Sequence, residues 1–71
     1  MRDLSKRECL ELETLVDMCG LSSVLMALSE ICGLKSEHLR NAWQDEKAAK
    51  YWAMLEGDIG CVVPHATSRG L

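Results

Sequence analysis

The side chains in this sequence whose types could support metal chemistry are four cysteines and two histidines. Structural zinc sites take two ligands from one short stretch, in pairs such as C-x2-C or H-x3-H, because neighbouring ligands orient the ion together. Cys61 and His65 come closest to such a spacing, and any further ligand would have to come from a distant part of the chain. The sequence therefore predicts no metal site.

Nucleophilic catalysis needs a cysteine or serine beside a base that a third group orients. Cys32 and His38 are six positions apart, and at 100° per residue they point to different sides of a continuous helix. Close carboxylates such as Glu11 and Glu13 are typical of a solvated helix face, and no glycine-rich run of the kind that holds phosphate precedes a helix. We therefore expect no enzymatic activity and no cofactor.

Length and composition set the fold class. The chain has 71 residues, of which 48% are hydrophobic, and it contains no phenylalanine. Helix-forming residues dominate and β-branched residues are scarce. The sequence predicts an all-α fold, a three-helix hairpin or bundle with one long central helix. We expect one helical domain over residues 1–60 and an irregular C-terminal tail over residues 61–71.

The charge balance argues against strongly charged partners. The formal net charge of −3 gives no electrostatic attraction to nucleic acid or to an anionic membrane. No apolar run approaches the roughly 20 residues of a membrane span, and residues 1–6 do not resemble a signal peptide. We therefore expect a cytoplasmic protein without membrane contact, in which the cysteines stay reduced and pack in the core.

A first helix is predicted to begin after Ser5. Ser5 and Glu8 have the spacing of a capping box, in which each side chain accepts a hydrogen bond from the other residue's backbone N–H. Gly20 stands where a glycine with positive φ would end the helix. The apolar residues between these two ends share one stripe. They are Cys9, Leu12, Leu15, Val16 and Cys19.

The second helix poses the main structural question, because Gly33 could either end it or lie within it. If one helix runs from Val24 to Trp43, its apolar residues keep a single phase across Gly33, and the glycine falls on the solvent side. We therefore predict one helix of about 21 residues, roughly 31 Å long, which Ser22 or Ser23 caps. The stripe along it consists of Val24, Leu25, Leu28, Ile31, Cys32, Leu39, Ala42 and Trp43.

The third helix is predicted to begin at Asp45, a favourable N-cap residue. It is expected to weaken at Gly57 and Gly60, because glycine costs helix stability, and residues 61–71 then follow as the tail. The expected apolar face comprises Ala48, Tyr51, Trp52, Leu55 and Ile59.

The two tryptophans allow two interpretations. Trp43 and Trp52 are expected to meet across the turn between the second and third helices, as part of the core. In the alternative, one of them protrudes and anchors a partner.

Residues 28–45, together with residues 49–52, resemble a group of small helical proteins of bacteria and phages. Those proteins also combine a Glu-His-Leu-Arg-like segment, here residues 37–40, with Trp-Gln-Asp and a following Ala-Lys-x-Trp-like helix, here residues 43–45 and 49–52. The resemblance covers about residues 11–56. It implies a helical fold and implies no activity, cofactor or partner.

Self-association is the leading functional hypothesis. The neighbouring helices, expected to have about 13 residues each, would span roughly 20 Å and be too short to cover the long stripe, and exposed methionines add apolar surface. A second copy, most often in a two-fold dimer, would bury this surface. We therefore expect a non-enzymatic homo-oligomer that acts as a protein-interaction module. The candidate surface comprises Val24, Leu25, Leu28, Ile31, Leu39, Trp43, Trp52, Met18, Met26 and Met54.

Two alternatives belong to other functional classes. In the first, residues 26–40 form a DNA-binding helix-turn-helix with Gly33 in the turn. The segment has few of the basic residues that phosphate contacts require. A straight helix at Gly33 would also count against this interpretation. Its DNA contacts would come from Lys35, Ser36, His38 and Arg40. In the second, the chain is a small acidic inhibitor from a mobile genetic element that binds a host protein.

Overall fold

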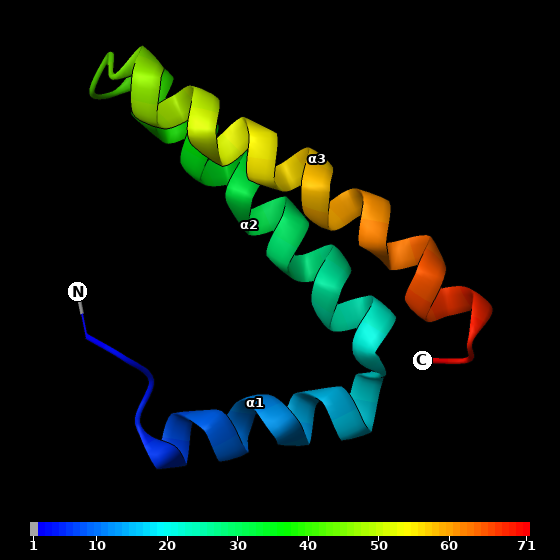
Figure 1. Cartoon of the computed structure of the whole chain (residues 1–71). Helices are drawn as coiled ribbons and strands as arrows, with labels where there is room; N and C mark the ends of the chain where they lie inside the picture. Colours follow the sequence, from blue (N-terminus) through cyan, green and yellow to red (C-terminus); the bar gives the residue numbers. More distant parts are fainter. Residues whose placement is uncertain (1) are drawn as a thin grey trace.

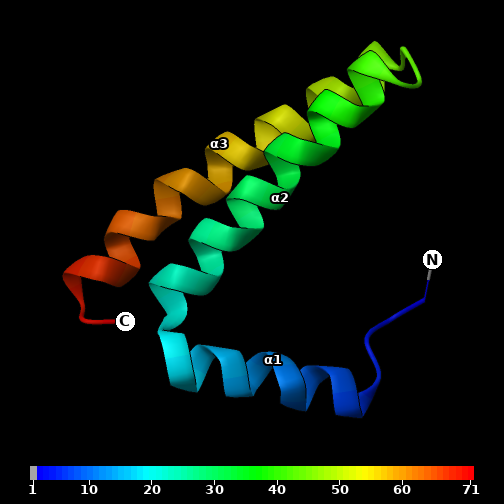
Figure 2. The same cartoon turned by 180° about the vertical axis from the view of Figure 1, so that it is seen from behind.

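The computed structural model describes residues 2–71, which form three helices and no strand. Helix α1 spans Lys6–Cys19, α2 spans Leu21–Asn41 and α3 spans Glu46–Ser68. Helices α2 and α3 lie side by side as an antiparallel hairpin, and α1 diverges from the end of the hairpin at which the C-terminus also lies (Figure 1). The view from behind shows the same open arrangement (Figure 2). The expected all-α fold is confirmed.

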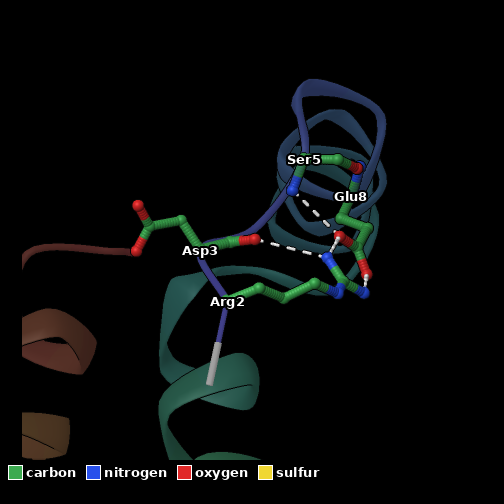
Figure 3. A network of polar contacts seen from close by, with 4 residues as sticks. All are labelled: Arg2, Asp3, Ser5 and Glu8. Carbon is green, nitrogen blue, oxygen red and sulfur yellow. Dashed lines mark hydrogen bonds and ion pairs between the residues drawn. The ribbon is translucent and has the colours of Figure 1, made fainter.

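Ser5 caps α1 as the sequence predicts. Its Oγ accepts a hydrogen bond from the Glu8 N–H at 3.1 Å, and Glu8 Oε1 accepts one from the Ser5 N–H at 2.9 Å. Arg2 adds a two-pronged ion pair, with Nη1 and Nη2 at 2.6 Å and 2.9 Å from the two carboxylate oxygens of Glu8 (Figure 3). The guanidinium of Arg2, followed by the hydrogen bonds from Ser5, lowers the pKa of the Glu8 carboxyl to about 2.

Helix α2 continues through Gly33 over all of its 21 residues, which confirms the single long helix. Its first residue, Leu21, follows Gly20 directly, and the expected side-chain cap from Ser22 or Ser23 is wrong. Instead, the Ser22 N–H donates to the carbonyl oxygen of Leu71 at 2.9 Å. The C-terminal end of the chain thus supplies an acceptor for the free N–H groups at the start of α2.

The expected solvent-facing position of Gly33 is also wrong. A Cβ added there would collide with the carboxylate of Glu56, so Gly33 lies against α3. The prediction failed because it took the large apolar side chains of α2 as the packing face. The contact with α3 uses a neighbouring face of smaller side chains.

Helix α3 continues to Ser68, so the expected irregular tail over residues 61–71 is wrong for most of that segment. Pro64 lies inside the helix and removes one backbone hydrogen bond without ending it. The helix ends in a Schellman motif, in which Gly70, at φ 77°, donates to the Thr67 carbonyl and Leu71 donates to the Ala66 carbonyl. Helix α3 is therefore as long as α2, and the expected length of about 13 residues was too short.

Small side chains bring α2 and α3 close together. Ala49 is fully buried, and Cys32, Ser36 and Ala66 are between 4% and 7% exposed. The Ser36 Oγ donates to the Ala49 carbonyl at 2.7 Å. The Ser29 Oγ donates to the Glu56 carbonyl at 2.9 Å, a second bond from a side chain of α2 to the backbone of α3. We call this contact the small-residue seam; it consists of Ser22, Ser29, Cys32, Ser36, Ala49, Gly60, Ala66 and Thr67.

The seam leaves several of the larger apolar side chains exposed. On α3, Tyr51 and Leu55 are 57% and 48% exposed, although the sequence placed both on the buried face. The expectation that the cysteines pack in the core is confirmed for Cys32, which is buried. It is wrong for the exposed Cys9, Cys19 and Cys61.

Ala49→Leu tests the seam directly. The added side chain has no room at a fully buried position, so we expect the free energy of unfolding to fall by roughly 1–3 kcal/mol, the usual cost of overpacking. Urea denaturation followed by circular dichroism measures this change. Lys50→Leu, at the adjacent exposed position, should leave it nearly unchanged; equal effects of the two variants would contradict the seam.

Gly57→Ala tests the continuation of α3 beyond the glycines. A Cβ at Gly57 meets nothing within 4 Å, so alanine in a continuous helix should raise the free energy of unfolding by about 0.5–1 kcal/mol. Gly70→Ala should lower it by about 1 kcal/mol, because its positive φ is strained for alanine. Both are measured by urea denaturation. If Gly57→Ala had no effect or lowered stability, the helix would not continue there.

The cap of α1 should titrate in strong acid. Because the pKa of Glu8 is lowered to about 2 from its ordinary value of 4.5, the stabilisation is complete above pH 4.5 and is lost as the pH falls through 2. Carboxyl-carbon NMR of Glu8 should show its midpoint near pH 2. Arg2→Ala should move that midpoint upward, and an unmoved midpoint would show that Arg2 does not hold the carboxylate.

Candidate interaction surface

An apolar notch lies between α1 and α2 near the bend of the chain. It encloses about 290 Å³, and almost all of its lining is apolar. The chain turns by 118° between the two helices, so the notch opens away from Gly20. Its lining residues are Leu12, Leu15, Cys19, Ser23, Val24, Ala27, Leu28 and Ile31.

Each wall of the notch is one apolar face of a helix, of α1 on one side and of α2 on the other. Leu12, Leu15 and Cys19 repeat at three and four residues along α1 and therefore share a face. Val24, Leu28 and Ile31 do the same along α2. Three residues of the α1 stripe and three of the α2 stripe thus converge on one notch.

Gly20 makes the bend possible. Its φ of 89° is a conformation that side-chain-bearing residues rarely adopt. A Cβ there would also lie 3.0 Å from the carbonyl oxygen of Leu71. The Gly20 N–H still donates to the Val16 carbonyl at 2.8 Å, so one residue both ends α1 and redirects the chain.

Both walls of the notch are open to solvent. Leu12 and Leu15 are 39% and 50% exposed, and Leu28 and Ile31 are 41% and 47% exposed. Among Lys6–Cys19, all of which the structure describes, no residue is buried. The folded chain therefore leaves most of the apolar stripe of α1 in contact with water.

The whole chain exposes more surface than a compact protein of its mass. Its accessible surface is 5809 Å² at 7.9 kDa, whereas folded monomers of that mass expose about 4,400 Å². Its radius of gyration is 14.0 Å, against about 11 Å expected for this length. The single chain thus exposes about 1,400 Å² more surface than a compact monomer of its mass.

The residues expected to form an interaction surface are distributed over several places. Val24, Leu28 and Ile31 line the notch. Leu25, Leu39 and Trp52 are half-buried. Three methionines are exposed as expected. They are Met18 at 76%, Met26 at 59% and Met54 at 57%.

The sequence reasoning missed the contribution of α1 to this surface. Leu12, Leu15 and Cys19 form the α1 wall of the notch. The sequence identified them only as part of one apolar stripe, with Cys19 expected in the core, and did not include them in the candidate surface. Their stripe was visible in the sequence. The bend that exposes it depends on Gly20, which the sequence marked only as a helix end.

Trp43 lies at the tip of the hairpin and does not pack in the core. It is 70% exposed, and its Nε1–H donates to His38 Nε2 at 3.0 Å. The two rings meet edge to face, with centroids 6.5 Å apart. The ring partner of Trp43 is therefore His38, and the expected packing against Trp52 as core is wrong for Trp43.

The helix-turn-helix interpretation lacks its turn, because α2 is helical on both sides of Gly33. Three of its four DNA contacts also have other partners. Ser36 is 4% exposed and bonded to Ala49, and Arg40 lies 3.5 Å from the Glu46 carboxylate. His38 is exposed but accepts the hydrogen bond from Trp43, and Lys35 remains exposed on α2.

Other site chemistry and the comparisons with known proteins add little. Within residues 2–71, no three His, Cys, Asp or Glu side chains gather as a metal site would require. None of the described helices could cross a membrane by itself; α1 and α2 reach the necessary length and apolarity only when taken together across their bend. Comparisons with protein-family models, curated proteins and solved structures give no match. The resemblance to small bacterial and phage proteins thus remains an expectation.

Proposed function

We propose that this chain is a non-enzymatic interaction protein that self-associates through the apolar notch between α1 and α2. The observation that carries the proposal is the surplus of accessible surface on the single chain. Two copies that each buried about 1,400 Å² would form an interface of about 2,800 Å², within the range of obligate homodimers. Burying little more than half of it would reach the roughly 800 Å² per partner of a standard interface.

The composition of the notch favours a stable contact over a transient one. The cores of homodimer interfaces are apolar and poor in charge, and the lining of the notch consists of apolar side chains and one serine. Burial of apolar area stabilises by roughly 25 cal/mol per Å². Leaving the leucine and isoleucine side chains of the notch in water therefore forgoes a large amount of free energy. A second copy with the same face recovers that free energy for both chains at once.

Leu15→Glu tests the proposal against a matched control. Leu15 lines the notch and is 50% exposed, whereas Leu10, on the same helix, is 55% exposed and does not line it. We expect light scattering at micromolar concentration to give a dimer for the native chain and for Leu10→Glu. A carboxylate in an apolar interface is costly, so Leu15→Glu should be a monomer.

Two results would contradict the proposal. One is a native chain that has the mass of a single copy at tens of micromolar. The other is an unchanged dimer in Leu15→Glu, which would place the interface elsewhere. Circular dichroism of both variants shows whether the helices persist, because both substitutions are at exposed positions of one helix.

A further inference from the structure

We infer that the occupant of the notch is α1 of a second copy, which lies antiparallel along the first α1 so that Cys9 of each chain adjoins Cys19 of the other. This inference rests on the proposed self-association and specifies its geometry. Three features support it: the fit of α1 to the notch, the direction from which α1 can enter, and the spacing of its apolar stripe.

The apolar stripe of α1 fits its own copy. An apolar helix face buries itself best against another apolar helix face, and α1 presents such a face without burying any residue of Lys6–Cys19, the whole of which is described. If α1 of each chain entered the notch of the other chain, it would contact both the α1 and the α2 of that other chain. The same surface would then be covered on both chains, as a two-fold axis requires.

The shape of the notch sets the direction. Helices α1 and α2, which line the notch, converge toward their junction (Figure 1), and Gly20 lies between them. The Cys19 end of an incoming α1 carries its own α2 and cannot enter this narrow end. At the other end, the described residues 2–5 form no helix, so we place the N-terminal end of α1 toward the partner's bend. This antiparallel direction also sets the positive end of each helix dipole beside the negative end of the other.

The spacing of the stripe sets the register. Cys9, Leu12, Val16 and Cys19 follow one another at intervals of three, four and three residues, which read the same in both directions. Two antiparallel copies can therefore align all four positions, with Leu12 against Val16 of the other chain and Cys9 against Cys19 at both ends. Leu15 then lies near the two-fold axis on the side of the notch.

The two cysteines make this register measurable. Cys9 and Cys19 are ten residues apart in one straight helix, about 15 Å, whereas a disulfide requires Cα atoms within about 7 Å. A disulfide between them must therefore join two chains. Both thiols are exposed and free, while Cys32 is buried.

The experiment oxidises the full chain with diamide, which takes up the two electrons and two protons that the thiols release. Cys61→Ser is used as the parent because Cys61 is also exposed. A glutamate-specific protease then cuts at Glu11 and Glu13 and separates Cys9 from Cys19 for mass spectrometry. We expect a covalent dimer that contains Cys9–Cys19 bonds. Adding either Cys9→Ser or Cys19→Ser should abolish the covalent dimer, because each remaining cysteine loses its partner.

The outcomes separate this inference from the proposed function. Light scattering of the unoxidised parent gives the oligomeric state independently of the cross-link. A dimer that yields Cys9–Cys9 or Cys19–Cys19 bonds, or no bond, would overturn the antiparallel pairing and leave self-association standing. A parent that is a monomer by light scattering would overturn both.

Discussion

The close approach of α2 and α3 is the contact on which the rest of this structure depends. Side chains no larger than threonine fill the seam, and two serine hydroxyls bond to the backbone of the facing helix. Because small residues form the seam, Leu28, Ile31 and Leu34 of α2 lie outside it and are exposed. The contact that stabilises the hairpin therefore also creates the apolar surface by which we propose that the chain associates.

Much of the fold could be predicted from the sequence because local rules govern it. The capping box at Ser5, the N-cap at Asp45 and the unbroken phase of α2 each depend on residues within a turn or two, and the structure contains all three. The end of α3 could not be predicted in the same way. Gly57, Gly60 and Pro64 disfavour a helix locally, but packing along α2 over its full length stabilises it there.

The candidate site was predictable only in part. Val24, Leu28 and Ile31 were expected to be uncovered; Leu28 and Ile31 are exposed, and Val24 is half-buried. The reason differs from the expected one, because α3 is long enough to cover α2 and packs on another face. A prediction from hydrophobic periodicity takes the stripe of large apolar residues as the packing face of the helix. It does not distinguish that stripe from a neighbouring face of serine, glycine and alanine, which permits closer helix contact. The bend at Gly20, which brings α1 into the site, depends on tertiary structure as well.

The dependence of the melting temperature on protein concentration tests the central claim most directly, namely that the surplus surface of the folded chain is covered by a second copy. Unfolding that includes dissociation becomes harder as the concentration rises, whereas unfolding of a monomer does not depend on it. The account predicts that the melting temperature, measured by circular dichroism, rises steadily from about 1 to 100 μM chain. A melting temperature that stays constant over this range would contradict it.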